Sequence, residues 1–154
     1  MIVNTLRFSF KDGTSEEDEQ AVLAAMRRTA STEPVAFSTV GRYMGDPADG
    51  FTHVYCAGVA DLTALERYMY EKVHLDGDWL IIPQLERLSA FRFSDDPDPD
   101  LDAKILALHA RKVEMYPEWG RLLDAIPGAR GSFGDGTGGA RLPMVGKTSP
   151  GATG

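Results

Sequence analysis

The chain opens with apolar and polar residues in alternation, a pattern typical of a strand with one buried face. Leu6, Phe8 and Phe10 are each followed by one polar residue, so their side chains share one side of a pleated strand. Extending the same phase backwards places Asn4 on that inner face. A buried amide needs hydrogen-bond partners, so Asn4 could orient a substrate carbonyl or an imidazole, or equally cap a backbone group.

A helix is predicted after the turn at residues 12–13. Thr14 or Ser15 can cap its first turn, which is acidic, and Thr14 and Glu17 have the spacing of a capping box. The apolar stripe of this helix consists of Val22, Leu23, Met26 and Ala30.

Three more strands are predicted from composition and from the turns that bound them. Residues 35–44 and 51–60 are typical of strands, and the segment between them, 45–50, has the composition of a loop. Alternation returns at residues 89–94, which predicts the fourth strand. Residues 79–85, interrupted by a proline, predict only a short helical turn.

A second helix carries the most informative pair of residues in the chain. Asp61 is suited to the N-cap, and Tyr68 lies on the edge of the apolar stripe, one turn beyond Leu65. His74 follows Tyr68 by six residues, at the predicted end of the helix. A phenol and an imidazole at the mouth of a cavity could act as proton donor and proton acceptor.

The predicted order within residues 1–94 is βαββαβ, which gives an α+β fold of the ferredoxin-like class. Helices cover only one face of such a sheet. The other face here carries Phe side chains from two strands, and an exposed apolar patch of that size indicates a partner. We therefore predict a homodimer that forms a dimeric α+β barrel.

The barrel domain is expected to end at residue 94, because residues 95–100 form an acidic, Pro-rich linker. Apolar spacing predicts a helical extension at 101–127, on which we interpret His109 and Lys112 as part of a solvated face. Residues 128–154 are so rich in glycine that we expect a flexible tail, or one draped over a neighbouring surface. The extension could also cross over and close the cavity of the partner subunit.

Composition excludes several classes of partner. The net charge is −7 and no basic stripe is present, which disfavours nucleic acid. The single cysteine, Cys56, excludes an internal disulfide and fits a reducing compartment. No segment has the roughly 18 consecutive apolar residues of a membrane span, and the first residues lack a signal-peptide pattern. We expect a cytoplasmic protein without a nucleic-acid or membrane partner.

Three short motifs within residues 1–94 carry a family resemblance. They are Phe10-Lys11-Asp12 after the first strand, Gly50-Phe51-Thr52-His53 at the start of the third, and Tyr68 with His74 around the end of the second helix. A chain with these motifs resembles the stress-responsive dimeric A/B barrel family, although Glu71-Lys72 stands where that family has His-Pro. Within the family, it looks like the olivetolic acid cyclase type of polyketide cyclase, which needs no cofactor.

The resemblance implies that Tyr68 and His74 are catalytic. An enolate-forming, aldol-type cyclisation needs a base with a pKa near neutrality and a donor for the developing oxyanion. Our hypothesis is that His74 removes an acidic proton from a polyketide-like, poly-β-carbonyl substrate of secondary metabolism, while Tyr68 donates to the carbonyl oxygen that gains charge. The structural alternative is that the Tyr68 hydroxyl lies in water and His74 only caps the helix C-terminus.

Four residues are candidates for contacts with a small hydrophobic or aromatic substrate. Asn4 reaches the predicted cavity from the first strand, and His53 begins the third strand, where it faces either the cavity or the dimer seam. Tyr55 and Trp79 could line an apolar cavity, although aromatic residues on strands more often belong to the core. The alternative for His53 is a structural role, in which its ring nitrogens find hydrogen-bond partners within the fold.

No cofactor and no metal site are predicted. His53, His74, Asp76 and Asp78 are suitable ligand types. Their spacing, however, matches no diagnostic metal-binding pattern.

The sequence is also compatible with two other functions. A cofactor-free monooxygenase acting on a polycyclic phenol is the second enzymatic interpretation, because a similar dimeric barrel hosts that chemistry. A non-catalytic dimer that serves in the stress response or binds a ligand is the third, since a fold by itself does not determine function.

Overall fold

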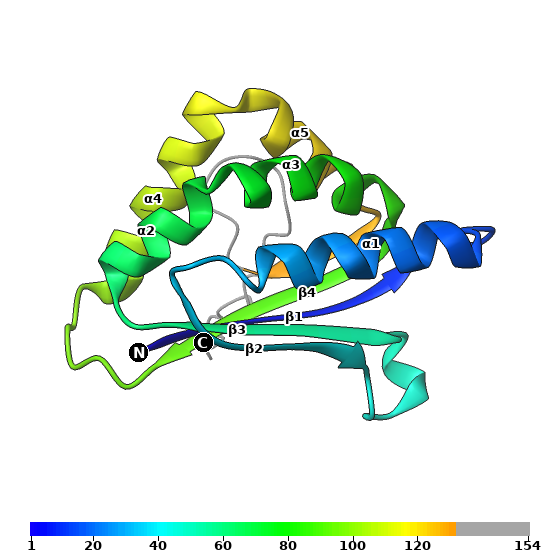
Figure 1. Ribbon diagram of the computed structural model, residues 1–154, viewed down its shortest axis with the longest axis horizontal. Helices are drawn as coiled ribbons and strands as arrows, with labels where there is room; N and C mark the ends of the chain where they lie inside the picture. Colours follow the sequence, from blue (N-terminus) through cyan, green and yellow to red (C-terminus); the bar gives the residue numbers. More distant parts are fainter. Residues whose placement is uncertain (132–154) are drawn as a thin grey trace, which may run out of the picture.

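The computed structural model describes residues 1–131, which form one sheet with helices packed against it (Figure 1). The elements are β1 (Ile2–Phe10), α1 (Glu16–Thr29), β2 (Val35–Arg42), η1 (Pro47–Asp49), β3 (His53–Val59), α2 (Leu62–Tyr70), α3 (Lys72–Ile81), η2 (Ile82–Gln84), β4 (Leu85–Ser94), α4 (Leu101–Met115), α5 (Pro117–Asp124) and β5 (Gly128–Gly131). The strand order is β2-β3-β1-β4-β5. Residues 132–154, most of the predicted tail, lie outside the described residues.

The predicted βαββαβ order is confirmed, and the sheet register explains which residues meet beneath the helices. β1 lies between β3 and β4 and is antiparallel to both, so Asn4 stands opposite Ala57 and Arg92. Two residues on, Leu6 stands opposite Tyr55. Because alternate residues of a strand share a face, Asn4, Leu6, Tyr55 and Arg92 all belong to the inner face.

Capping and charge explain the first helix. The side chain of Ser15 accepts a hydrogen bond from the backbone N–H of Asp18 at 3.1 Å, so Ser15, and not Thr14, is the N-cap of α1. The first turn is acidic, and Arg27 and Arg28 occupy the last turn. These charges complement the helix dipole at both ends.

The second predicted helix is in fact two helices. Glu71 has an extended backbone, with φ −56° and ψ 133°, which ends α2 and starts α3. His74 therefore lies in the first turn of α3, a helix that replaces the short turn predicted near residue 79. Gly77 lets α3 approach α1 closely, because a Cβ there would lie 3.1 Å from Thr29 Oγ1.

All five α-helices of the described chain lie on one face of the sheet (Figure 1). The opposite face carries Phe37 from β2 and Phe91 and Phe93 from β4, which are 45%, 46% and 58% exposed. A bare sheet face with Phe side chains from two strands is what the sequence predicts.

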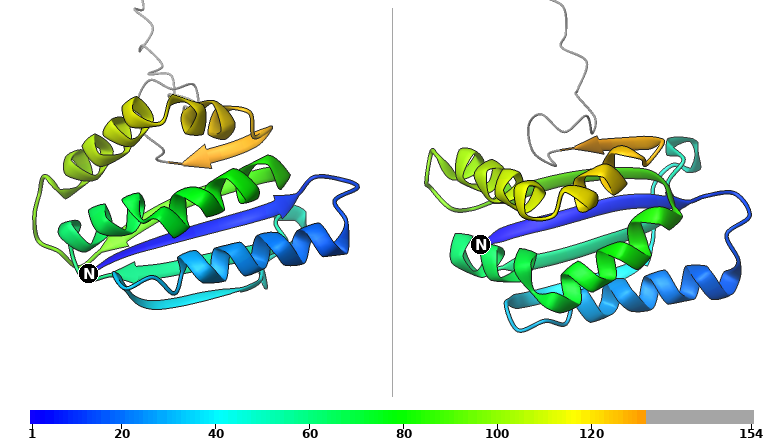
Figure 2. Two further views of the ribbon diagram at one scale, coloured as in Figure 1. Left: turned by 45° about the horizontal axis from the view of Figure 1, so that its top comes forward. Right: turned by 90° about the horizontal axis from the view of Figure 1, so that it is seen from above.

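The C-terminal extension packs on its own domain. Figure 2 shows α4 and α5 on the β4 side of the helical layer, with β5 beside β4. The Gly-rich segment thus contributes a short strand that was not predicted, and β5 runs parallel to β4. The extension covers the inner face of its own sheet.

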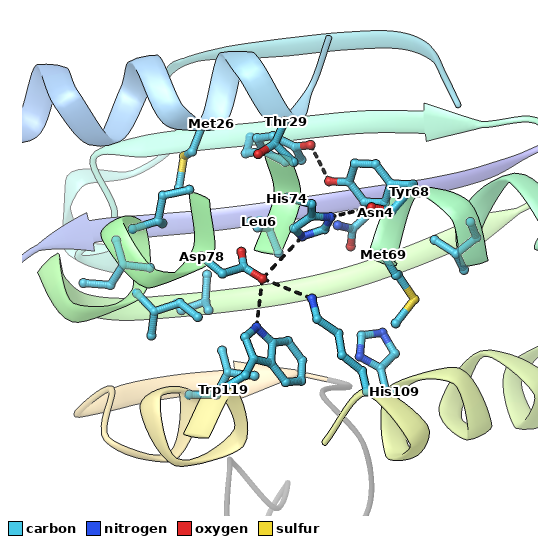
Figure 3. Close-up of a pocket in the computed structure, with 18 of the residues that line it drawn as sticks. Asn4, Leu6, Met26, Thr29, Tyr68, Met69, His74, Asp78, His109 and Trp119 are labelled. Atoms are coloured by element: carbon cyan, nitrogen blue, oxygen red, sulfur yellow. Dashed lines mark hydrogen bonds and ion pairs between the residues drawn. The ribbon is translucent and has the colours of Figure 1, made fainter. Parts of the chain in front are cut away.

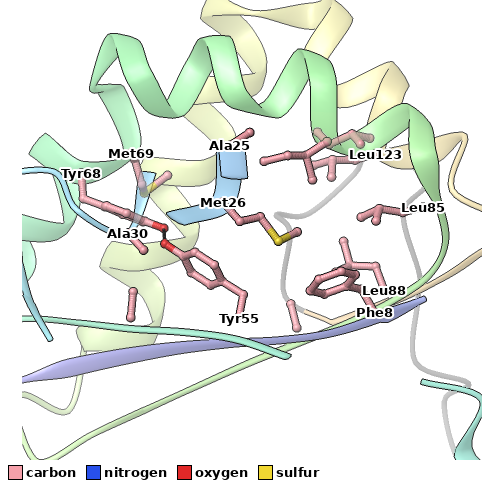
Figure 4. Close-up of a cluster of buried hydrophobic side chains, with 14 of the residues drawn as sticks. Phe8, Ala25, Met26, Ala30, Tyr55, Tyr68, Met69, Leu85, Leu88 and Leu123 are labelled. Atoms are coloured by element: carbon pink, nitrogen blue, oxygen red, sulfur yellow. Dashed lines mark hydrogen bonds between the residues drawn. The ribbon is translucent and has the colours of Figure 1, made fainter. Parts of the chain in front are cut away.

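The extension and the barrel domain share one hydrophobic core. Phe8 is fully buried at its centre, and Met26 of α1, Leu88 of β4 and Leu123 of α5 belong to the same cluster (Figure 4). α5 is therefore an integral part of the folded unit.

Within residues 1–131, no helix combines the length and the apolar character needed to cross a membrane.

Candidate active site

A cavity of about 90 Å³ lies between the inner face of the sheet and the helices (Figure 3). Most of its wall is apolar, with Leu6, Met26 and Leu88 among the lining residues. The residues with polar groups on the wall are Asn4, Thr29, Tyr55, Tyr68, His74, Asp78, Arg92, His109, Lys112 and Trp119. The structure thus brings four of the predicted site residues to one cavity: Asn4 of β1, Tyr55 of β3, Tyr68 of α2 and His74 of α3.

Tyr68 of α2 and Tyr55 of β3 meet through their hydroxyl groups (Figure 4). Their side chains are only 3% and 2% exposed, so the alternative in which the Tyr68 hydroxyl lies in water is wrong. Burial, reinforced by the Tyr55 phenol, raises the pKa of Tyr68 well above its ordinary value, and burial also raises the pKa of Tyr55. Both phenols therefore keep their protons at neutral pH and serve as hydrogen-bond donors.

One ring nitrogen of His74 is used at the end of α2. Nδ1 lies 2.9 Å from the backbone oxygen of Tyr68 (Figure 3). A carbonyl oxygen only accepts, so Nδ1 carries the proton and Nε2 of the neutral ring is an acceptor. The carbonyls of the last helical turn lack intrahelical partners, so His74 caps α2, as the structural alternative anticipated. The same contact fixes the tautomer of the imidazole.

The surroundings of His74 keep its ring neutral near pH 7. Burial lowers the pKa of His74, the carboxylate of Asp78 opposes this effect, and the ammonium of Lys112 adds to it. The centroids of the Tyr68 and His74 rings are 4.5 Å apart. A neutral imidazole whose Nε2 has no proton is the form that can act as a base.

Asp78 lies one turn after His74 on α3 and collects contacts from two further helices. Its Oδ2 is 3.6 Å from His74 Nε2. The same oxygen accepts hydrogen bonds from Lys112 Nζ of α4 at 3.1 Å and from Trp119 Nε1 of α5 at 2.8 Å. In the sequence, Asp78 attracted attention only as a possible metal ligand, because Lys112 and Trp119 are more than thirty residues away along the chain.

The interpretation of His109 and Lys112 as a solvated face is wrong. They are 5% and 1% exposed. With Ile105 and Leu108 they occupy positions i, i+3, i+4 and i+7 of α4, the spacing of a single helix face. That spacing was the available signal: two polar residues continue the apolar stripe and are buried with it.

A second polar contact on the cavity wall joins β4 to α4. Arg92 donates from a terminal guanidinium nitrogen to His109 Nε2 at 2.7 Å. Because that nitrogen accepts, the proton of the neutral His109 ring is on Nδ1. Burial, with the nearby Arg92 and Lys112 charges, lowers the pKa of His109 to about 2, and burial lowers the pKa of Arg92 to about 10.

Some polar atoms on the wall are buried without a hydrogen-bond partner in the part of the chain that the structure describes. They are Asn4 Oδ1, Thr29 Oγ1 and His109 Nδ1. Buried polar groups are normally satisfied by protein or water. The three residues come from β1, α1 and α4, which lie on different sides of the cavity.

Two predicted substrate contacts lie away from this cavity. His53 stacks on Phe8 with ring centroids 5.5 Å apart, meets Phe10 edge-on, and has Nδ1 2.8 Å from Thr52 Oγ1. Trp79 is 40% exposed on α3. Neither residue lines the cavity that Tyr68 and His74 share.

Among residues 1–131, no group of three His, Cys, Asp or Glu side chains is placed to hold a metal ion.

Comparison with known families identifies the domain that carries this site. A family model described as the stress responsive A/B barrel domain matches residues 2–95. That region contains Tyr55, Tyr68, His74 and Asp78, and it ends before α4. No curated protein matches the sequence significantly.

Several solved structures share the fold. A protein of the same family from Mesorhizobium loti has a ferredoxin-like fold and is 19% identical, with a TM-score of 0.53 over 62% of this chain and 96% of that chain. A dimeric ferredoxin-like protein from Thermobifida fusca is 18% identical, with a TM-score of 0.54 over 60% and 89%. A hydroxynitrile lyase from Passiflora edulis is 17% identical, with a TM-score of 0.56 over 62% and 94%.

Proposed function

This chain belongs to the stress responsive A/B barrel domain family, and we propose that it is a cofactor-independent acid–base enzyme that acts at a carbonyl group. The observation that carries the proposal is the fixed tautomer of His74. Its Nδ1 is bound to the Tyr68 carbonyl oxygen, so the nitrogen without a proton is presented at a buried, mostly apolar cavity.

His74 supplies the base. Nε2 removes a proton from a carbon that lies between two carbonyl groups, and the electron pair of that C–H bond forms an enolate. Attack of the enolate carbon on a second carbonyl carbon forms the new C–C bond, and the oxygen that gains charge takes the proton back from the imidazolium. A neutral ring at the start of this cycle is consistent with the lowered pKa of His74.

Tyr68 and Tyr55 supply the hydrogen-bond donor. When Tyr55 donates to Tyr68, the hydroxyl hydrogen of Tyr68 is available to an oxyanion. The first hydrogen bond also polarises the second. A preorganised donor in a site without bulk water stabilises developing negative charge more strongly than water does.

The volume of the cavity limits the size of the substrate that can bind. About 90 Å³ is well below the roughly 300–1,000 Å³ of sites for drug-sized ligands. A small carbonyl compound fits the cavity as it stands. Cyclisation of a polyketide-like, poly-β-carbonyl substrate in the manner of the olivetolic acid cyclase type requires α4 and α5 to move outward, because those helices form the outer wall.

The direct test is turnover by the full-length protein with three probes: a linear poly-β-carbonyl thioester, a hydroxynitrile, and deuterium exchange at the central carbon of a 1,3-diketone. The hydroxynitrile is included because one structural neighbour is a hydroxynitrile lyase. We expect His74→Gln and Tyr68→Phe each to lower kcat on the order of 100-fold. Tyr116→Phe, which removes a hydroxyl that does not line the cavity, should keep the wild-type rate.

Near-normal rates in both site variants would contradict the assignment. Running the reaction under oxygen and under argon separates this chemistry from that of a cofactor-free monooxygenase, because strict dependence on oxygen excludes simple cyclisation. The small size of the cavity also favours a second candidate, a non-catalytic ligand-binding protein. Binding of a probe without turnover in the wild type would support that candidate.

The bare sheet face supports assembly into a homodimer. Phe91 and Phe93 of β4 and Phe37 of β2, two strands away, are all exposed on the face opposite the helices. Burying exposed aromatic area drives association. Each chain contains the complete set of cavity residues described above, so we expect the dimer to join two independent sites back to back across their sheets.

A further inference from the structure

Asp78 Oδ2 is the point where three helices meet around the proposed base. His74 Nε2 of α3 lies 3.6 Å away, Lys112 Nζ of α4 lies 3.1 Å away, and Trp119 Nε1 of α5 lies 2.8 Å away (Figure 3). The distance to His74 is longer than a hydrogen bond, whereas the other two distances are hydrogen bonds. The carboxylate is therefore held by the extension while it faces the imidazole.

The two residues that hold Asp78 also hold each other. Lys112 Nζ lies 4.2 Å from the centroid of the Trp119 ring, which is within the range of a cation–π contact. Lys112 is 1% exposed, and a charge buried to that degree needs a partner of opposite sign. Asp78 is that partner, so the lysine and the carboxylate fix each other's position.

We propose that Asp78 is the positioning residue for His74, and that Lys112 and Trp119 of the C-terminal extension hold it there; the catalytic meaning of this arrangement rests on the proposed function. Asp78 faces the nitrogen that receives the proton, because the Tyr68 carbonyl already occupies Nδ1. When Nε2 takes a proton, the imidazolium of His74 is attracted to the carboxylate of Asp78, 3.6 Å away.

The ammonium group of Lys112 weakens the effect of the Asp78 carboxylate on the neutral His74 ring. Its positive charge beside Asp78 reduces the field that the carboxylate exerts on the resting ring, so the imidazole stays neutral before the substrate proton moves. The family domain ends at residue 95, and Lys112 and Trp119 come from outside it. The extension therefore holds Asp78 in place and supplies the positive charge of Lys112, whereas the base, His74, belongs to the barrel domain.

Three other titratable or charged residues surround His74. Tyr68 approaches from α2, Arg92 from β4, and His109 from α4. Arg92 acts on His74 in the same direction as Lys112, and the Tyr68 carbonyl acts in the same direction as Asp78. These groups remain unchanged in the variants below, so the effects of Asp78 and Lys112 can be separated from theirs.

The test is an NMR titration of the His74 imidazole in the full-length protein without substrate. We expect Asp78→Asn to lower the midpoint of the His74 titration and Lys112→Met to raise it. Lys112→Arg, which keeps the charge, should restore the wild-type midpoint. Lys104→Met removes an exposed lysine from the same helix and serves as the matched control with no shift. If Asp78 and Lys112 only supported the fold, their two variants would not shift the His74 midpoint in opposite directions.

A second comparison still tests the proposal if Asp78→Asn fails to fold. Asp78→Asn leaves Lys112 buried without a counter-ion, whereas the double variant Asp78→Asn with Lys112→Met leaves no unpaired charge. The midpoint of the double variant should be lower than that of Lys112→Met alone. The urea midpoints of Asp78→Asn and Trp119→Phe should be non-additive, because the two side chains share one hydrogen bond.

Equal midpoints in all variants, or shifts of the same sign for Asp78→Asn and Lys112→Met, would overturn the positioning role. This result is distinguishable from failure of the proposed function. If the predicted shifts occur while His74→Gln keeps full turnover, the base assignment fails and the positioning stands. If His74→Gln is inactive but the midpoints do not move, only the positioning role is lost.

Discussion

The imidazole of His74 donates from Nδ1 to the backbone oxygen of Tyr68, 2.9 Å away. This one contact caps the C-terminal end of α2 and orients the ring. The two interpretations of His74, a helix cap and a base, are therefore compatible, because each uses a different ring nitrogen. The Tyr68 backbone is part of the cap, and the Tyr68 hydroxyl lies against Tyr55.

The junction between α2 and α3 should accept a proline at position 72. Glu71 already has the extended backbone that the residue before a proline prefers, and position 72 is the first residue of α3, where the N–H has no helical partner. Lys72→Pro should leave the free energy of unfolding unchanged or raise it by about 0.5 kcal/mol, as measured by urea denaturation. Asp76→Pro, inside α3, should cost about 3 kcal/mol or more. Equal losses in the two variants would contradict this view of the junction.

The two tyrosine hydroxyls should be energetically coupled. Tyr68→Phe leaves the buried Tyr55 hydroxyl without its partner, and Tyr55→Phe does the same to Tyr68. Each single change should lower the free energy of unfolding by about 1–3 kcal/mol, whereas the double change should cost less than the sum of the two. A double-mutant cycle in urea measures the coupling. Strict additivity would mean that the hydroxyl contact does not stabilise the fold.

Acid should destabilise the protein through His109. Its folded pKa of about 2 lies below the unfolded value near 6.5, so between these values only the unfolded chain binds the proton. This contribution is present above pH 6.5 and is lost as the pH falls toward 2. Between pH 7 and pH 5, wild type should lose about 2 kcal/mol more than His109→Gln. Urea unfolding of both proteins at each pH is the measurement, and parallel losses would contradict the lowered pKa.

A charge on the bare sheet face should disrupt the dimer. Phe93 is 58% exposed in the single chain, and Phe93→Glu would place a carboxylate in the proposed interface. The cost of burying it should be on the order of 3 kcal/mol, which weakens dimerisation about 100-fold. Sedimentation velocity over a range of concentrations measures this change. Met44→Glu, in an exposed loop, is the control, and equal behaviour of the two variants would place the interface elsewhere.

Local chemistry accounts for the parts of the fold that could be predicted. Alternation around Phe8 defines β1, and the caps at Ser15 and Asp61 form as their side chains suggest. The helix α3 was missed because its middle, around Gly77, has low helical propensity. Its stability depends on the close approach to α1, which is a tertiary contact.

The candidate site was predictable only within the barrel domain. The spacing of Tyr68 and His74 shows in the sequence because both residues lie in one short segment. The spacing of Lys112 on α4 could have indicated that it is buried, but the sequence could not show that Lys112 and Trp119 meet Asp78, because both lie more than thirty residues from it along the chain. The strand β5 was missed for a related reason: four residues form a strand there because β4 offers an edge to pair with.

The extended backbone at Glu71 makes the length of the junction matter more than its composition. Each residue of an α-helix turns the next side chain by about 100° around the axis. One residue inserted between Glu71 and His74 would therefore rotate the imidazole away from the Tyr68 carbonyl oxygen and from the cavity. Substitutions at positions 71 and 72 leave that angle unchanged, so this segment can vary freely in sequence and hardly at all in length.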